Sequence, residues 1–303
     1  MYNGVLNIYK EPGFTSHDVV AKLRGILKQK KIGHTGTLDP DAVGVLPVCL
    51  GKATKLCDML TDEKKTYRAV LRLGVDTDTQ DMSGEILEEK CVNVTESEVR
   101  ECIRGFVGEQ MQSPPMYSAL KVDGKKLYEL AREGKTVERK ARPVTFFEIQ
   151  ICEMNLPEVT MLVTCSKGTY IRTLCHDIGE KLGVGGAMQH LTRTQVGRFE
   201  IQNAMKLSEI EEKVQTKTID EVIVSVEDMF ESLPKACTQE IFDRVVYNGN
   251  ALRIDQFKEK ELSCVDGAEL RVYDSKQCFI GIFEYEERRE IYKPRKMFLE
   301  RSN

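Results

Sequence analysis

The interpretation of this sequence begins from one stretch, Gly33-His34-Thr35-Gly36-Thr37-Leu38-Asp39-Pro40. Residues 31–44 contain three glycines and a proline, a composition that predicts a loop with special backbone angles and no regular element. Asp39 lies within this loop. An aspartate in such a place is usually a turn or cap residue, and the alternative is a carboxylate displayed by a rigid backbone. The loop alone leaves both interpretations open.

A second glycine-flanked cluster favours the functional interpretation. Residues 165–174 read Cys-Ser-Lys-Gly-Thr-Tyr-Ile-Arg-Thr-Leu. They follow a strand expected at 159–165 and open a helix expected near 170–182. Tyr170 and Arg172 are therefore expected at the start of a helix, a common position for site residues.

The remaining sequence predicts a mixture of helices and strands. Residues 5–9 and 67–74 have the alternation of strands, and Ser16 is a plausible N-cap of a helix with apolar residues at three-and-four spacing. Thr95 and Glu98 form a capping box that opens another helix. Further elements are expected as follows: strands at about 143–153 and near 196–202, a hairpin turn at Asp123-Gly124, an acidic helical connector over 206–235, and short strands at 270–273 and 279–283.

These elements predict an α+β protein with two domains. The chain has 303 residues, which corresponds to about two domains of average size. We expect a main domain over residues 1–235 and a small β-rich domain over 236–303.

The charges are unevenly distributed. The net charge is −4, which by itself speaks against a nucleic-acid partner. Residues 121–142, however, carry 8 Lys and Arg against 4 Asp and Glu, whereas residues 201–240 carry 4 against 9. A polyanion is held by local positive surface and not by the total charge of the chain. On charge alone, a solvated helix face remains the commoner explanation.

Several classes of protein are not expected. The sequence contains no run of about twenty apolar residues, so we expect no membrane span. Residues 1–4 lack the features of an export signal, which favours a soluble, cytoplasmic protein. The ten cysteines include no Cys-x-x-Cys pair, so we expect buried, reduced thiols and no metal centre. The segment from Asp76 to Leu87 begins like a calcium loop but lacks its glycine and its final glutamate.

Motifs in order across about 200 residues resemble the TruB family of tRNA pseudouridine synthases. The motifs that carry the resemblance are Gly33–Pro40 with Gly44, Leu46-Pro47, Gly51–Lys55, Lys65–Arg68, Leu73-Gly74 with Thr77–Gly84, Pro114–Lys121, Gly168–Leu174 and Leu191–Phe199. The resemblance implies a mixed, mainly antiparallel sheet flanked by helices. It also implies isomerisation of uridine 55 to pseudouridine in the T loop of tRNA.

The resemblance assigns roles to individual residues. Asp39 matches the catalytic aspartate of the family, and Arg172 matches the arginine that pairs with it. Tyr67 matches a tyrosine that stacks on the target base, Tyr170 another tyrosine of the active site, and Leu191 an apolar residue that lines the pocket. The reaction loses no electrons or groups, so no cofactor is expected. Whether the carboxylate attacks the sugar, attacks the base or abstracts a proton stays open.

Further residues are expected to bind the tRNA. His34 corresponds to a histidine that packs into the T loop, and the insertion at about 111–142 to a segment that closes over the RNA. Its candidate phosphate contacts are Lys121, Lys125, Lys126, Arg132, Arg139 and Arg142. The C-terminal part resembles a PUA-type RNA-binding domain more loosely. We expect a monomer.

Three alternatives remain. A non-catalytic tRNA-binding protein or folding chaperone would have no need for Asp39. A metal-dependent hydrolase would use Asp76, Asp78 and Asp81, which instead match a turn motif of the family. A related synthase that modifies ribosomal RNA under guide RNAs would carry a Lys-rich tail, which this sequence lacks before Asn303.

Overall fold

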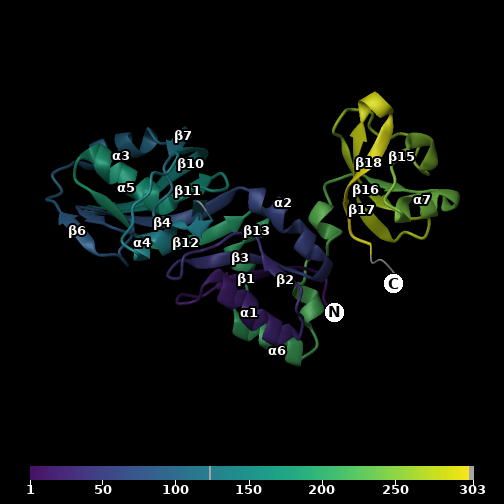
Figure 1. Ribbon diagram of the computed structural model, residues 1–303, viewed down its shortest axis with the longest axis horizontal. Helices are drawn as coiled ribbons and strands as arrows, with labels where there is room; N and C mark the ends of the chain where they lie inside the picture. Colours follow the sequence, from purple (N-terminus) through teal and green to yellow (C-terminus); the bar gives the residue numbers. More distant parts are fainter. Residues whose placement is uncertain (123, 300–303) are drawn as a thin grey trace.

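The computed structural model describes residues 1–122 and 124–299, and two sheets organise them (Figure 1). The larger sheet has the order β1-β3-β12-β4-β11-β10-β7, with β2 added to β3 and β13 to β12. Its strands are β1 (Gly4–Lys10), β2 (Ile32–His34), β3 (Val43–Leu50), β4 (Lys65–Leu73), β7 (Gly108–Gln112), β10 (Arg142–Asn155), β11 (Glu158–Cys165), β12 (Gly186–Val196) and β13 (Phe199–Glu200). Among the described strands of this larger sheet, β3 and β12 pair in parallel and the other pairs are antiparallel. The prediction of a mixed, mainly antiparallel sheet is confirmed.

Helices cover this sheet in two groups. Near β1 and β3, α1 (Ser16–Leu27) packs beside α6 (Leu207–Gln215), and at the other end α3 (Glu96–Arg104) packs beside α5 (Ile171–Leu182) (Figure 1). The shorter elements are η1 (Gly51–Leu56), α2 (Cys57–Asp62), β5 (Val75–Thr77), β6 (Ile86–Glu89), β8 (Lys121–Val122), β9 (Lys125–Lys126), α4 (Leu127–Arg132), η2 (Ile201–Asn203), η3 (Ile219–Val222) and η4 (Asp228–Phe230).

Strand β4 shows why these residues form a sheet. Its alternate residues Tyr67, Ala69, Leu71 and Leu73 are buried, and the residues between them are more exposed. Side chains of a strand point to opposite faces in turn, so one face of β4 enters the core beneath α3 and α5. The predicted strand at 67–74 is confirmed, and so is the capping box of Thr95 and Glu98.

The start of α1 differs from the prediction. Thr15, and not Ser16, is the N-cap, since its hydroxyl accepts a hydrogen bond from the Asp18 N–H at 3.1 Å. The Ser16 hydroxyl is buried and accepts a hydrogen bond from the Leu38 N–H at 2.9 Å. Helix α1 therefore fixes the backbone of the residue that precedes Asp39.

Other predicted boundaries need correction. The strand expected near 196–202 is confirmed only as the two-residue strand β13 (Phe199–Glu200), and the long strand here, β12, was not predicted and ends at Val196. Because β12 has mostly polar residues between Gln189 and Gln195, its sequence does not show the alternation of apolar and polar residues that predicts a strand. The loop expected over 31–44 begins with the short strand β2, which pairs with the end of β3. In the acidic connector only α6 is a regular α-helix, and short 3-10 turns follow it.

The smaller sheet forms a β-rich domain at one end of the molecule (Figure 1). Its order is β14-β16-β17-β18-β15, so the strands predicted at 270–273 and 279–283 are confirmed. The elements of this part are β14 (Lys235–Cys237), η5 (Glu240–Phe242), α7 (Asp243–Tyr247), β15 (Leu252–Arg253), η6 (Ile254–Gln256), β16 (Glu269–Tyr273), β17 (Phe279–Glu286), η7 (Glu287–Arg289) and β18 (Ile291–Met297). Ile282 and Phe298 join a core cluster with Leu56 and Phe230, which connects the two sheets.

Three further predictions concern the hairpin at Asp123-Gly124, the cysteines and membrane-spanning helices. In the predicted hairpin β8 pairs with β9, but Asp123 of its turn lies outside the described residues. The ten cysteines are free thiols, and the expectation that they are buried is wrong for four exposed ones: Cys91, Cys152, Cys264 and Cys278. Among residues 1–122 and 124–299, no helix combines the length and apolar character needed to cross a membrane.

Gly44 is required where β3 meets β12. Its φ of +104° lies in the region that favours glycine, and it pairs with Arg193. A Cβ at this position would lie 2.2 Å from the Arg193 carbonyl oxygen. We expect Gly44→Ala to lower the free energy of unfolding by about 2 kcal/mol or more, measured by urea denaturation. The control is Gly25→Ala in α1, where the Cβ meets open space and should add about 0.5–1 kcal/mol. Equal stabilities of the Gly44 variant and the wild type would show that this position tolerates a side chain, contrary to the expectation.

Candidate active site

An ion pair joins the loop of Asp39 to the first turn of α5. The Arg172 Nε lies 3.1 Å from Asp39 Oδ2, and the Arg172 Nη2 lies 3.3 Å from Asp39 Oδ1. The Arg172 side chain is 6% exposed, whereas that of Asp39 is 40% exposed. Two contacts from one guanidinium fix the orientation of the carboxylate. Asp39 is therefore held on one side and open on the other.

The guanidinium of Arg172 has further partners. It donates to the Thr79 carbonyl at 3.2 Å and to the Tyr117 carbonyl at 2.9 Å, and its Nη1 lies 3.5 Å from Asp81 Oδ2. A buried charge is tolerated only when it is paired and hydrogen-bonded. These contacts from separate segments hold Arg172 in one place.

Lys10 supports the loop of Asp39 from within the protein. Its Nζ is fully buried and donates to the Pro40 carbonyl at 2.9 Å and to the Ala42 carbonyl at 2.6 Å. Burial lowers the pKa of Lys10 to about 8, and the nearby Asp39 partly opposes this shift. The ammonium group thus fixes the backbone on the C-terminal side of Asp39.

The protonation of Asp39 reflects two opposing effects. Burial raises the pKa of Asp39 above its ordinary value of 3.8, and Arg172 acts in the opposite direction. Asp81 adds to the increase because it is a second carboxylate near the same guanidinium. Arg172 is therefore the group that favours ionisation of Asp39 most.

Tyr67 of β4 and Leu191 of β12 lie diagonally across this strand pair, since Tyr67 pairs with Arg193 and Leu191 with Ala69. Both are buried, and they belong to the core cluster that also contains Leu38. Burial raises the pKa of the Tyr67 phenol, and Arg193 opposes this through its charge and a hydrogen bond. Tyr67 thus lies close enough to Asp39 for its charge to act on the phenol, and Leu191 belongs to the same core cluster as Leu38 of the loop.

Tyr170 is the N-cap residue of α5, and its backbone is held by one side chain. The Gln112 amide accepts from the Tyr170 N–H at 2.8 Å and donates to the Tyr170 carbonyl at 3.0 Å. Burial raises the pKa of the Tyr170 phenol, while Ser118 and Arg172 lower it. Tyr170, Arg172 and Asp39 thus form one group.

His34 is the last residue of β2, at the N-terminal side of the loop that carries Asp39. Its Nδ1 accepts a hydrogen bond from the Gly36 N–H at 3.3 Å, and its ring meets that of His17 edge-on at 5.1 Å. Burial lowers the pKa of His34 to about 4, so the ring is neutral at pH 7. A neutral imidazole suits packing against bases better than pairing with phosphates.

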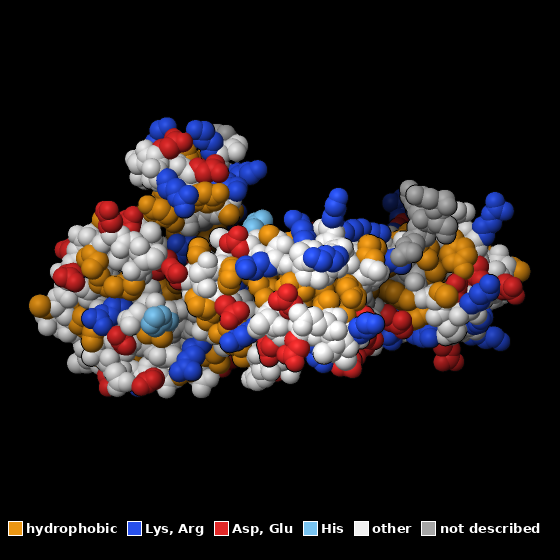
Figure 2. Space-filling view, turned by 90° about the horizontal axis from the view of Figure 1, so that it is seen from below, with side chains coloured by type: hydrophobic (Ala, Val, Ile, Leu, Met, Phe, Trp, Pro, Cys, Tyr) orange, Lys and Arg blue, Asp and Glu red, His pale blue; other side chains and the backbone are white. Residues whose placement is uncertain are grey.

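The predicted basic residues are mostly exposed, and one of them, Arg142 at the start of β10, lies close enough to Tyr170 to lower the pKa of its phenol. Basic side chains gather on a lobe that projects from the molecule in Figure 2, where the segment of α4 lies. Lys121, Arg132 and Arg142 are exposed. Lys125, also exposed, lies 3.5 Å from Glu133.

Two of these basic residues are bound within the protein. The Lys126 Nζ donates to the Tyr128 hydroxyl at 3.1 Å, and Arg139 donates to the Pro114 carbonyl at 3.1 Å. Neither contact uses a carboxylate, so both cations keep charge available for an anionic partner.

The carboxylates proposed for a metal hydrolase serve different partners. Asp76 accepts from the Gly186 N–H at 3.3 Å, Asp78 from the Tyr117 hydroxyl at 3.1 Å, and Asp81 contacts Arg172. Within the part of the chain that the structure describes, no three His, Cys, Asp or Glu side chains form a group that could hold a metal ion. The geometry does not support the hydrolase interpretation.

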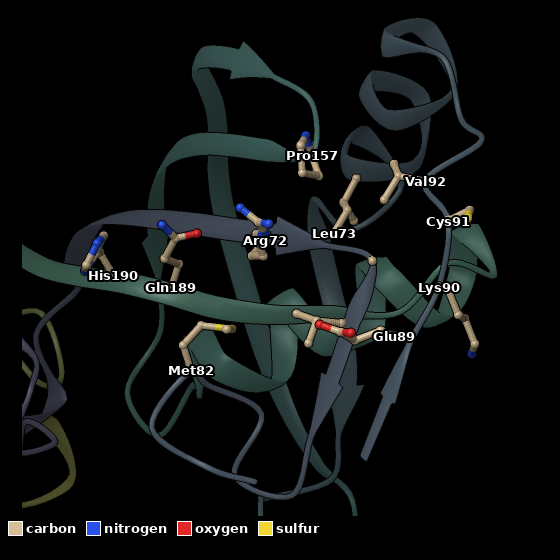
Figure 3. Close-up of a pocket in the computed structure, with 12 residues that line it drawn as sticks. Arg72, Leu73, Met82, Glu89, Lys90, Cys91, Val92, Pro157, Gln189 and His190 are labelled. Atoms are coloured by element: carbon tan, nitrogen blue, oxygen red, sulfur yellow. The ribbon is translucent and has the colours of Figure 1, made fainter. Parts of the chain in front are cut away.

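A pocket of about 660 Å³ lies away from this group (Figure 3). It lies at the end of β4 and is lined by residues that include Arg72, Met82, Lys90, Pro157 and His190. None of the candidate catalytic side chains lines it. The site is therefore recognised by its ion pair and not by this cavity.

Sequence reasoning missed several residues of the site. Asp81 and Arg193 lie within the family motifs but were given no role in the site, although Asp81 contacts Arg172 and Arg193 contacts the loop. For Lys10 the sequence did offer a signal: a charged residue directly follows Ile8-Tyr9 in an otherwise mainly apolar strand. Gln112 gave no signal, because its partner is a backbone 58 residues away.

The raised pKa of Asp39 predicts an effect on stability. Ionisation of a group whose pKa is raised in the folded state disfavours folding, so this group stabilises less as the pH rises through its folded-state pKa. We expect Asp39→Asn to raise the free energy of unfolding at pH 7, and the gain to shrink as the pH falls toward 3.8. Urea denaturation at both pH values measures this. The exposed neighbour is the control, since Asp41→Asn should change stability by less than about 0.5 kcal/mol. A gain that does not depend on pH would contradict the explanation.

Comparisons with known proteins agree on one family. Residues 24–171 match the family model described as TruB family pseudouridylate synthase (N terminal domain), and residues 172–231 match the tRNA pseudouridylate synthase B C-terminal domain. A tRNA pseudouridine synthase B from Lachnoclostridium phytofermentans is 54% identical over 98% of this chain and 100% of its own length. One from Clostridium tetani is 45% identical over 92% of this chain and 94% of its own length.

Solved structures share the fold. The chain is similar to one in a crystal structure of a Cbf5-Nop10-Gar1 complex, with a TM-score of 0.75 and 28% identity over 98% of this chain and 85% of that chain. It is also similar to one in an H/ACA RNP bound to a substrate RNA, with a TM-score of 0.74 and 26% identity over 99% of this chain and 86% of that chain. With relatives at this identity and coverage, the chain belongs to the TruB family of pseudouridine synthases.

Proposed function

We propose that this protein converts uridine 55 in the T loop of tRNA into pseudouridine. The observation that carries the proposal is the half-open Asp39 carboxylate held by the buried Arg172, with Tyr67 and Tyr170 beside it. The relatives described above are named tRNA pseudouridine synthase B, which supports tRNA as the substrate.

The chemistry fits a carboxylate without a cofactor. The reaction breaks the N1–C1′ bond, turns the base and joins C5 to C1′, so the atoms of the nucleotide are conserved apart from proton movements. An ionised carboxylate can act as a nucleophile or stabilise a cationic sugar. Arg172 favours the ionised form of Asp39 and so opposes the effect of burial on its pKa. We assign Asp39 as the catalytic residue and Arg172 as the group that orients it.

The aromatic residues would receive the target base. A uridine within a folded loop must be extruded, which costs a few kcal/mol. Stacking on an aromatic ring offsets about 1–3 kcal/mol per base. Tyr67 is the proposed stacking partner, with Leu191 as a wall of the pocket, and Tyr170 completes the site next to Asp39.

The tRNA would contact several surfaces. His34 would pack against the displaced bases of the T loop. The basic insertion would bind phosphates through Lys121, Lys125, Lys126, Arg132, Arg139 and Arg142. We propose a catalytic domain over residues 1–235 and a PUA-like RNA-binding domain over 236–303, the last four residues of which lie outside the described chain. We further propose a cytoplasmic monomer.

Two alternatives are less well supported. The solved structures in RNA-guided assemblies are 26–28% identical to this chain, whereas the curated relatives with the tRNA name are 43–54% identical. This difference favours tRNA as the substrate over a guide-RNA system. A chaperone without catalysis has no need for a carboxylate held by a buried arginine.

The catalytic role of Asp39 predicts a separation of binding from turnover. We expect Asp39→Asn to bind an unmodified T-arm stem-loop with a Kd within threefold of the wild type, and to lower the rate by at least 10⁴-fold. The product is mapped by the position of the isomerised nucleotide. The control is Asp41→Asn, two residues away and exposed, which should keep the wild-type rate. Normal turnover by Asp39→Asn would refute the assignment.

The basic insertion predicts a change in salt dependence. We expect Lys125→Ala combined with Lys126→Ala to weaken tRNA binding and to reduce the slope of log Kd against log salt by about 1–2. Filter binding at several salt concentrations measures this slope. Lys213→Ala with Lys217→Ala removes two charges from the α6 region and should leave the slope unchanged. A slope that is unchanged in the first variant would remove the insertion from the interface.

A further inference from the structure

Arg193 is a buried cation with an unusual set of partners. It lies on β12, is 1% exposed, and is among the largest fully buried side chains of the described protein. Within residues 1–122 and 124–299 no carboxylate forms an ion pair with it. Taking such a charge out of water is costly unless hydrogen bonds replace the solvent. The partners of Arg193 therefore indicate what the charge is used for.

These partners come from three separate segments. The Arg193 Nε donates to the Val45 carbonyl of β3 at 2.6 Å, and its Nη2 donates to the Gly36 carbonyl of the Asp39 loop at 3.2 Å. Arg193 is also the register partner of Tyr67 on β4, so the two side chains share a face of the sheet, and Arg193 lies close enough to act on the pKa of the Tyr67 phenol. The five N–H donors of a guanidinium suffice for all three contacts.

The arrangement links two groups that the proposed reaction needs together. One guanidinium connects the loop that carries Asp39 to the ring of Tyr67. The close approach of the strands at this point depends on Gly44, which lies directly against the Arg193 backbone. A rigid bridge of this kind sets the distance between the carboxylate and the phenol, and positioning of this kind strongly affects rates.

We infer that Arg193 is a positioning residue of the active site, which holds the Tyr67 phenol against the Asp39 loop and polarises its oxygen. The inference rests on the proposed function, because it concerns the same site. The positive charge also favours negative charge on the phenol, since Arg193 opposes the effect of burial on the pKa of Tyr67.

Lys65 provides a matched control. It is a buried cation on β4, two residues from Tyr67, and its Nζ donates to the Thr61 carbonyl at 2.7 Å and to the Glu63 carbonyl at 2.8 Å. Lys65→Met therefore removes a buried positive charge near the site without removing the bridge to Tyr67. An effect of Arg193→Met that Lys65→Met does not reproduce is therefore caused by loss of the bridge to Tyr67 and not by loss of a buried charge alone.

The first measurement does not depend on catalysis. The full-length protein is labelled with 13Cζ-tyrosine, and the Tyr67 resonance is assigned by its loss in Tyr67→Phe. We expect Arg193→Met to move the Tyr67 resonance and to leave those of the other tyrosines in place. Arg193→Lys should give a smaller change, and Lys65→Met none. An unmoved Tyr67 resonance in Arg193→Met, or in Arg193→Lys if the first variant does not fold, would overturn the inference.

The second measurement is the single-turnover rate with an unmodified T-arm stem-loop. We expect Arg193→Met to lower the rate by about 100-fold or more with a Kd within threefold of the wild type, and Arg193→Lys to recover at least tenfold. A rate within threefold of the wild type in Arg193→Met would overturn the inference, as would an equal loss in Lys65→Met. A wild-type protein that forms no pseudouridine would instead refute the proposed function, while the Tyr67 resonance would still decide the contact.

Discussion

The ion pair between Asp39 and Arg172 is the interaction that gives the site its geometry. A carboxylate within a glycine-rich loop would otherwise be free to turn, and the Arg172 guanidinium, whose side chain is 6% exposed, would lose one of its two carboxylate neighbours. Burial disfavours ionisation of Asp39, and Arg172 is the neighbour that opposes this effect most. The backbone carbonyls of Thr79 and Tyr117 complete the shell of the arginine.

The surrounding fold holds this pair in a fixed frame. Lys10 and Ser16 bind the backbone on both sides of Asp39, one from β1 and one from α1. Gln112 binds both backbone groups of Tyr170, at the start of the basic insertion. The carbonyl of Tyr117, within that same insertion, contacts Arg172. The segment proposed to close over the RNA is therefore connected directly to the residues proposed to act on the base.

Part of the fold and of the site could be predicted from the sequence. Strands such as β4 follow from their alternation, and the resemblance supplied Asp39 and Arg172 as partners although 133 residues separate them. Strand β12 was not predicted, because this central strand contains many polar residues and so lacks the alternation of apolar and polar residues. Ser16 was expected as a cap and is a support for Leu38. A contact to backbone atoms, such as that of Gln112 with Tyr170, leaves no pattern in a single sequence, because every residue carries the same backbone groups.

A crystal structure of the Asp39→Asn variant bound to an unmodified T-arm stem-loop would show whether the reacting nucleotide reaches this ion pair. We expect uridine 55 to be turned out of the loop, with its C1′ within about 4 Å of the side chain at position 39 and its base on the Tyr67 ring. Arg172 would keep its contact with position 39. A target base that stays stacked in the loop, or that lies in a different part of the protein, would show that Asp39 does not act on it.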